Sequence, residues 1–208
     1  MPQTNKLSNK SYKWALASLM ASGLLVSAVF PAFSQKPKKV KNETIEATAM
    51  GTGTQMGQVI SISVEIYDYS TPEDRQVLVQ AFSTGQNQGL VNALTKMHAV
   101  GHISITGTLG YDLAFIRMIP TPTGRKIRFV TNRQLRFGEV FTDSQSTAFN
   151  LTGGEFDVDD TNKKNSSGVL YPECQLAIDK EGQLQIQLAQ NAWKLIDVLD
   201  YKGTPGVN

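Results

Sequence analysis

The densest group of polar side chains beside predicted strands lies in the segment 131–139 (TNRQLRFGE). On an extended chain, Arg133 and Glu139 share one face with two large apolar residues, Leu135 and Phe137. An unpaired charge on such a face would be costly. The pattern therefore predicts an ion pair that pins the chain, with the grip of an anionic ligand as the alternative, since a guanidinium recognises carboxylates well.

Candidate ligand-binding residues in this segment are Arg133, Arg136 and Glu139. A hydrolase built on Arg133, Glu139 and the acids near Asp157 would need these side chains to converge in one cleft with perturbed ionisation. The sequence contains no Gly-x-Ser-x-Gly elbow, and its two histidines leave little material for a catalytic triad. We therefore predict no catalytic residue, and keep the hydrolase as the alternative to a binding protein.

Candidate metal ligands follow at alternate positions further along the chain. Asp157, Asp159 and Thr161 resemble the start of a calcium loop. Asn162 stands where such a loop needs glycine, and Gly168 stands where it needs a bidentate glutamate. The sequence excludes an EF-hand and leaves Asp157 and Asp159 as candidates for a looser calcium site, with an ordinary solvated turn as the other interpretation.

A glycine-rich run at 51–57 (GTGTQMG) has the composition of a phosphate-binding loop. It lacks the Lys-Ser/Thr ending of a P-loop, and a predicted strand follows it where a helix N-terminus would be needed. We expect a loop at this position, and nothing in the sequence predicts a cofactor.

The elements that must position these residues are mostly strands. Apolar and polar residues alternate in a period of two, or cluster as β-formers, at 60–66, 102–106, 111–119, 125–131, 148–158, 174–178 and 184–188. Asp179 to Gly182 (DKEG) predicts the turn of a hairpin between the last two strands. The apolar segment Trp193 to Leu199 fits either a final strand or a helical turn.

Helical signals interrupt the strands after residue 70. Thr71-Pro72-Glu73-Asp74 combines an N-cap threonine, a proline at the first helical position and acids in the first turn. Gly85 can end this helix, and Asn87 can cap a second one that stops at Gly101. The predicted fold class is α+β: a mostly antiparallel, curved sheet or open barrel with a two-helix hairpin inserted after the first strands.

The N-terminus has the pattern of a cleavable signal peptide over residues 1–34. Three lysines precede an apolar run from Trp14 to Phe30, and small residues at Ala32 and Ser34 suit a signal peptidase. The run is shorter than the roughly 20 predominantly apolar residues of a membrane span. We expect export to the periplasm or beyond and no stable membrane span after cleavage, with an uncleaved anchor as the alternative.

The charge changes sign along the chain. Seven of the 20 basic residues precede residue 42 and all 18 acidic residues follow it, so residues 42–208 carry 13 positive against 18 negative side chains, a net charge of −5. This acidic balance excludes a nucleic-acid-binding surface. We expect a basic disordered leader at 35–42, a single domain at 43–202 and a tail at 203–208. Cys174, the sole cysteine, is expected to be buried and unpaired within the chain.

The segment FVTNRQLRFGEVF, preceded by a GRKI strand and followed by a β-rich tail, resembles a family of uncharacterised secreted bacterial proteins. These proteins carry a T-x-R-x-hydrophobic-x-F-x-E segment, and the likeness runs from about Val59 to Tyr201. Asn132 and Gln134 depart from the commonest form of the segment, which has Asp and Pro. The resemblance implies export and a single domain, and it assigns no functional residue.

Taken together, these patterns favour an exported, non-enzymatic domain that binds a small ligand or an envelope partner. A hydrolase with a carboxylate and arginine cleft is the alternative. The ligand and the oligomeric state stay open at this point.

Overall fold

The computed structural model describes residues 42–135, 148–180 and 182–202. The predicted signal peptide, residues 35–41 of the predicted leader and the C-terminal tail lie outside the described residues. The elements are β1 Glu43–Met50, the 3-10 turn η1 Gly53–Gln55, β2 Val59–Ile66, α1 Pro72–Lys96, β3 Gly101–Ile105, β4 Tyr111–Leu113, β5 Phe115–Thr121, β6 Gly124–Thr131, β7 Leu151–Asp159, η2 Lys163–Asn165, β8 Ser167–Ile178, β9 Leu184–Leu188 and β10 Trp193–Lys202.

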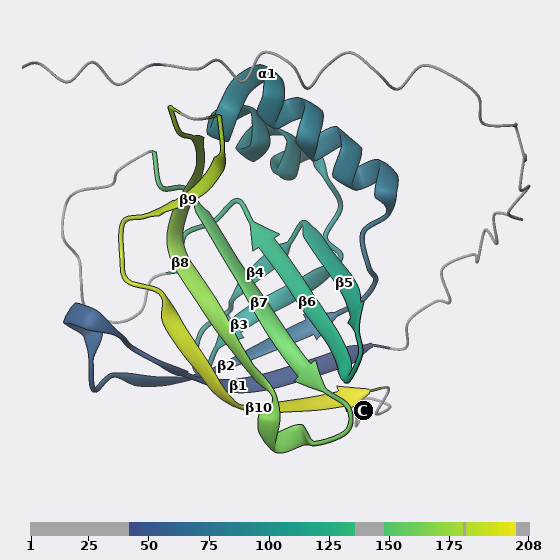
Figure 1. Cartoon of the computed structure of the whole chain (residues 1–208), viewed down its shortest axis with the longest axis vertical. Helices are drawn as coiled ribbons and strands as arrows, with labels where there is room; N and C mark the ends of the chain where they lie inside the picture. The colour runs from purple at the N-terminus through teal and green to yellow at the C-terminus, as the bar shows by residue number, and fades with distance from the viewer. Residues whose placement is uncertain (1–41, 136–147, 181, 203–208) are drawn as a thin grey trace, which may run out of the picture. The chain divides into compact units, whose positions relative to one another are not determined.

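The ten strands of the described residues form one sheet in the order β4-β3-β2-β1-β10-β8-β7-β6-β5, with β9 paired to β8. Every pairing is antiparallel. β4 and β5 lie at opposite ends of this order, yet Ala114 alone separates them in sequence. The sheet therefore curls round until its ends meet, which gives a nearly closed, barrel-like sheet (Figure 1) and confirms the curved antiparallel sheet that the sequence predicts.

The interior of this sheet is filled by apolar side chains. Alternate residues of each strand point inwards, and Trp193, Phe156 and Ile103 are fully buried there. The rings of Phe129 and Phe156 pack with their centroids 5.6 Å apart. Gly154 makes room for this contact, because a Cβ at that position would lie 2.3 Å from the Phe129 ring.

The start of α1 follows the sequence prediction. The Asp74 amide donates to Thr71 Oγ1 at 3.2 Å and the Thr71 amide donates to the Asp74 carboxylate at 2.8 Å, which completes a capping box. Pro72 occupies the first turn, where its missing N–H costs no hydrogen bond.

The predicted two-helix hairpin is not shown, because the described residues contain one helix, α1. A single non-helical residue, Gln86 (φ 52°, ψ −145°), kinks α1 next to the predicted break at Gly85. Asn87, expected to cap a second helix, instead uses its side chain against the sheet: its Oδ1 accepts from the Leu176 amide of β8 at 2.9 Å. This hydrogen bond connects the kinked part of α1 to the sheet.

Two further segments test the sequence prediction, one near the middle of the chain and one at its C-terminal end. The stretch 111–119, expected as one strand, is divided at Ala114 into β4 and β5, since the two ends of the sheet meet there. The C-terminal segment that fitted either strand or helix is a strand, β10, which pairs with β1 and β8 and so joins the two halves of the sheet.

Candidate functional site

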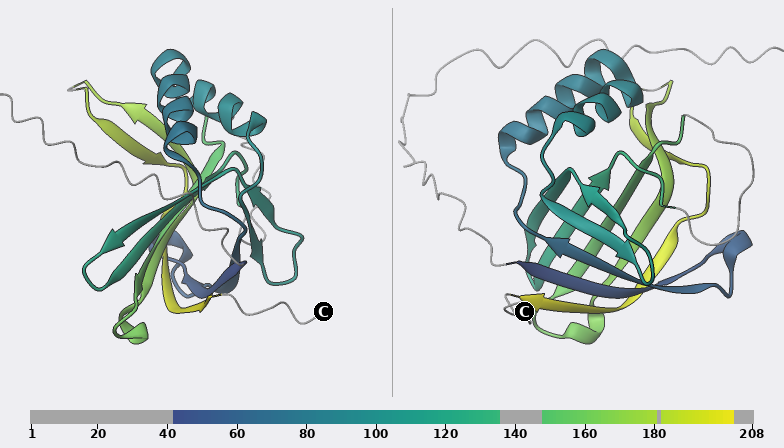
Figure 2. Two further views of the ribbon diagram at one scale, coloured as in Figure 1. Left: turned by 90° about the vertical axis from the view of Figure 1, so that its right-hand side faces the viewer. Right: turned by 180° about the vertical axis from the view of Figure 1, so that it is seen from behind.

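A groove of about 820 Å³ lies between α1 and the outer face of the sheet. We call it the outer groove. Residues of β5 to β8 line its floor, and residues of the β8–β9 hairpin line a second wall. Figure 2 shows this hairpin beside α1. Its apolar lining is Leu78, Val79, Phe82, Leu90, Phe115, Phe129, Val130, Leu151, Val169, Tyr171, Cys174, Leu176, Ile178, Leu184 and Ile186.

The floor of the outer groove is hollow at its centre because of Gly153. The sheet register sets Gly153 between Val130 of β6 and Tyr171 of β8. A Cβ at this position would meet only the Phe129 carbonyl oxygen, at an ordinary contact distance of 3.7 Å. The absence of a side chain at Gly153 therefore opens space without relieving any backbone clash.

The hairpin wall is apolar on the side that faces the groove. Three cross-strand pairs build that side: Cys174 with Leu188, Leu176 with Ile186, and Ile178 with Leu184. Every residue of β9 is exposed, and Leu184 keeps 61% of its surface in contact with solvent. The predicted turn is confirmed, with the Gly182 amide donating to the Asp179 carbonyl at 3.0 Å.

Arginines gather at one end of the outer groove. Arg117 of β5 and Arg128 of β6 are register partners, and Arg128 pairs across the sheet with Glu155 of β7. Burial raises the pKa of Glu155, but hydrogen bonds from Lys126 and Arg128 outweigh it and hold that pKa below its usual value. Arg75, from the first turns of α1, lines the same groove.

Cys174 lies below the hairpin, in a second apolar cluster that packs α1 onto the sheet. It is buried and has no disulfide partner, as the sequence predicts. Burial raises the pKa of its thiol to about 12, so this side chain acts as part of the core.

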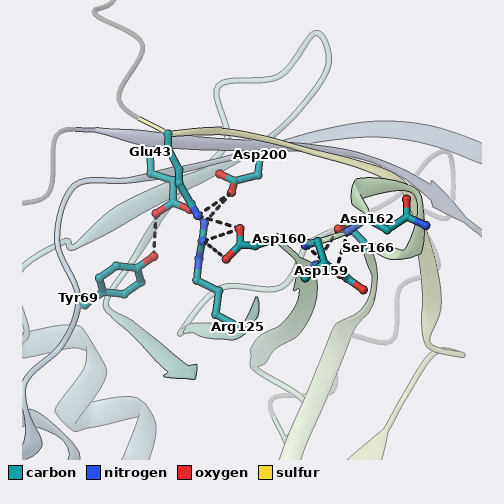
Figure 3. Close-up of polar contacts among 10 residues, drawn as sticks. Glu43, Tyr69, Arg125, Asp159, Asp160, Asn162, Ser166 and Asp200 are labelled. Atoms are coloured by element: carbon teal, nitrogen blue, oxygen red, sulfur yellow. Dashed lines mark hydrogen bonds and ion pairs between the residues drawn. The ribbon is translucent and has the colours of Figure 1, made fainter. Parts of the chain in front are cut away.

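A separate group of polar side chains surrounds the buried Arg125 of β6 (Figure 3). Its guanidinium contacts Glu43 at the start of β1, Asp200 at the end of β10 at 2.6 Å, and Asp160 at 3.4 Å. Tyr69 donates its hydroxyl to Glu43 at 2.8 Å. We call these five residues the Arg125 cluster.

The centre of the Arg125 cluster is buried. The side chains of Arg125, Glu43 and Asp200 are all less than 10% exposed. Burial and the adjacent Glu43 charge raise the pKa of Asp200, against the lowering effect of Arg125. The cluster joins the first strand, the last strand and β6, so its chemistry is that of an ion network that ties the ends of the domain together.

The predicted ligand-binding residues are only partly described. Arg133 lies exposed just after β6 and, among the described residues, has no ion-pair partner. It lines a smaller, more polar hollow of about 490 Å³ together with His102 and Asp112. Arg136 and Glu139 lie outside the described residues, so their pairing with Arg133 stays a prediction.

The predicted metal candidates serve two different local structures. Asp157, on the outer face of β7, pairs with Lys126 at 3.0 Å. Asp159 accepts hydrogen bonds from its own loop, including the Thr161 hydroxyl at 2.6 Å and the Asn162 amide at 2.9 Å, which lower its pKa to about 2. No group of three or more potential protein ligands is found in the described part of the chain. Calcium binding by this loop stays a prediction.

The residues of the outer groove were missed by the sequence analysis. Arg117 and Arg128 lie in strands whose apolar and polar residues alternate. In such a pattern, a charged residue indicates an ordinary solvent-facing position. Arg75 reads as an ordinary exposed helix residue. No local signal shows that the curl of the sheet and the packing of α1 bring the three together.

Compared with protein-family models, curated proteins and solved structures, the chain gives no match. Among the described residues, no helix has both the length and the apolar character required to cross a membrane.

Proposed function

We propose that this chain is an exported, non-enzymatic protein that binds a small apolar or amphipathic molecule in the outer groove. The observation that carries the proposal is the groove itself: about 820 Å³ of space lined mainly by apolar side chains. This volume falls within the range of about 300–1,000 Å³ that is typical of small-molecule sites.

The apolar walls support this proposal because they remain uncovered. Val79 of α1 is 53% exposed, and Ile186 and Ile178 of the hairpin are 50% and 47% exposed. Contiguous exposed apolar surface of this kind marks interaction sites in soluble proteins. The interior of the sheet, by contrast, is packed with its own buried apolar side chains.

Binding is favoured over the hydrolase alternative by the state of the acidic groups. The described carboxylates that meet an arginine inside the fold belong to the Arg125 cluster, where the partners bury one another. A hydrolytic site needs acids that reach a substrate from a cleft. Among the described residues that line the outer groove, Glu155 is the single acid, and it is engaged by Lys126 and Arg128.

The test is a titration with N-phenyl-1-naphthylamine, an uncharged apolar dye that brightens when it leaves water. We expect saturable binding to the protein and a loss of at least tenfold in affinity for Gly153→Phe, because the new ring fills the hollow floor. The matched control is Ser61→Phe, which adds the same ring to an exposed position of β2. Equal binding by both variants, or no binding by the parent protein, would overturn the proposal.

Export is proposed on the N-terminal pattern of three lysines, an apolar run and the Ala32-Phe33-Ser34 sequence. Protein recovered from the medium or periplasm of an expressing bacterium should begin at Gln35. N-terminal sequencing measures this directly. Membrane-bound material that still begins at Met1 would show an anchor in place of a signal peptide.

A further inference from the structure

The arginine end of the outer groove carries more positive charge than its acidic neighbour can balance. Arg75, Arg117 and Arg128 line the groove, and Glu155 is the one acid among its described lining residues. Glu155 is itself shared, since Lys126 contacts it at 2.9 Å and Arg128 contacts it from the other side. Within the described residues, neither Arg75 nor Arg117 has an ion-pair partner.

The fold holds these arginines together at a cost. Arg117 and Arg128 stand directly opposite each other on β5 and β6, an arrangement in which like charges are destabilising. The start of α1 is fixed beside them, because the Ser70 amide donates to the Ile116 carbonyl at 2.8 Å and the Ser70 hydroxyl accepts from the Ile116 amide at 3.0 Å. Because Arg75 follows in the first turns of α1, it lines the same groove as Arg117.

The remainder of the outer groove has the opposite character. Beyond the row of Arg117, Arg128 and Glu155, the next row of the floor towards α1 is Phe115, Val130, Gly153 and Tyr171, and the hairpin adds Ile178, Leu184 and Ile186. One end of the groove is therefore cationic, and the rest is a continuous apolar channel.

We propose that the outer groove binds a free single-chain carboxylate amphiphile of the fatty-acid type. Its carboxylate is held by Arg75 and Arg117, and its alkyl chain lies over Gly153 between α1 and the hairpin. A guanidinium matches a carboxylate in charge and in its two-point geometry. This inference rests on the proposed function, because it assigns a chemical class to the ligand of the same groove.

The test compares hexadecanoate with the uncharged alcohol of the same chain length, each competing with N-phenyl-1-naphthylamine below its aggregation concentration. The parent protein should prefer the acid by about tenfold or more, as charged hydrogen bonds to an arginine pair allow. Arg75→Gln with Arg117→Gln should abolish this preference, so that the acid and the alcohol compete equally with the dye. Arg133→Gln with Lys194→Gln, which removes the same two charges at exposed positions outside the groove lining, is the matched control and should leave the preference for the acid unchanged.

A second measurement follows the alkyl chain through a series of carboxylates of increasing length. Each methylene that enters the apolar channel should tighten binding about threefold to fourfold until the channel is filled. Gly153→Phe should shorten the longest chain that still gains affinity.

The outcomes separate the two proposals. If the dye binds in the groove but acid and alcohol compete equally in the parent and in the arginine double variant, the fatty-acid inference is wrong and the proposed function stands. If the dye fails to bind, both are wrong. Sedimentation with phosphatidylcholine vesicles that is unaffected by Gly153→Phe would assign the apolar hairpin to a membrane surface and would also overturn the inference.

Discussion

The two faces of β6 and β7 show how one pair of strands can serve two different purposes. On the inner face, Arg125 is surrounded by carboxylates and Phe129 packs against Phe156. On the outer face, Arg128 pairs with Glu155 as its one acidic partner among the described residues, and Gly153 leaves open space. The inner face pairs its buried arginine with acids and is packed with apolar side chains, whereas the outer face has exposed arginines and exposed apolar side chains.

This difference indicates where ligand chemistry belongs in the molecule. A buried arginine that is already paired with acids cannot bind a further anion. We therefore assign the Arg125 cluster a role in stabilising the fold. Exposed arginines beside unfilled apolar space can still bind an anion. We therefore assign ligand binding to the outer groove. The comparison predicts that substitutions on the inner face change stability and that substitutions on the outer face change binding.

The largest effect should come from Arg125→Met. The variant leaves the carboxylates of Glu43 and Asp200 buried without their cation, and removal of one partner from a buried ion pair costs about 3–5 kcal/mol. Denaturant unfolding, followed by the fluorescence of the buried Trp193, measures the loss. Arg117→Met on the outer face is the control and should change the free energy of unfolding by less than about 0.5 kcal/mol. Similar losses in both variants would remove the distinction between the two faces.

A smaller effect should separate two adjacent glycines of β7. Gly154→Ala places a methyl group 2.3 Å from the Phe129 ring, and overpacking of this kind costs about 1–3 kcal/mol. Gly153→Ala points into the outer groove, where a Cβ has room, and should leave the free energy of unfolding within about 0.5 kcal/mol of the parent. The same unfolding experiment compares them, and a larger loss for Gly153→Ala would contradict the assignment of faces.

The Arg125 cluster should also give a signed pH dependence. The pKa of Asp200 is raised by burial and by Glu43, so the folded state binds its proton more tightly than the unfolded state. Its contribution to stability is complete below the unfolded pKa of about 3.9 and is lost as the pH rises through the folded pKa. The free energy of unfolding of Asp200→Asn should therefore gain on that of the parent as the pH is raised from 4 to 7.

Asp160 supplies a control of opposite sign. A hydrogen bond from Lys202 lowers its pKa, so its contribution is present above the unfolded pKa and is lost as the pH falls through the folded one. Asp160→Asn should gain on the parent as the pH is lowered from 6 towards 3. Urea titrations at several pH values measure both variants, and parallel pH profiles for the two would contradict the assigned causes.

The smallest effect is expected at Arg133. Its side chain is exposed, and exposed ion pairs contribute about 0–1 kcal/mol. Arg133→Ala should therefore cost less than about 1 kcal/mol, and a double-mutant cycle with Glu139→Ala shows whether the predicted pair exists. Additive losses in that cycle would show that the two residues do not interact.

The sequence predicts the fold better than the site, for a physical reason. The alternation of Ile60, Ile62, Val64 and Ile66 predicts β2 directly, because strand patterns are local. The sequence does not predict β1, because its inward positions include the charged Glu43 and two small alanines. The cation that pairs with Glu43 is Arg125, which lies 82 residues away in sequence. The helix α1, which is kinked at Gln86, is likewise held by a hydrogen bond that the Leu176 amide of a distant strand donates to Asn87.

The site depends wholly on such long-range relations. Arg75, Arg117 and Gly153 come from a helix and two strands, and no spacing in the sequence connects them. They meet because β5 and β7 are each paired to β6 and because Ser70 fixes the start of α1 to β5. Sequence patterns locate each element, whereas the groove arises from the pairing order and the placement of α1.

The most direct test of the division between a filled interior and a ligand-binding outer groove is methyl NMR with a fatty acid that carries a nitroxide near the end of its chain. The paramagnetic label broadens only methyl groups close to it. We expect the signals of Ile178, Leu184 and Ile186 to lose intensity while those of the interior residues Ile45 and Ile103 are retained. Broadening of the interior methyls, or of none in the groove at saturating ligand, would contradict the account.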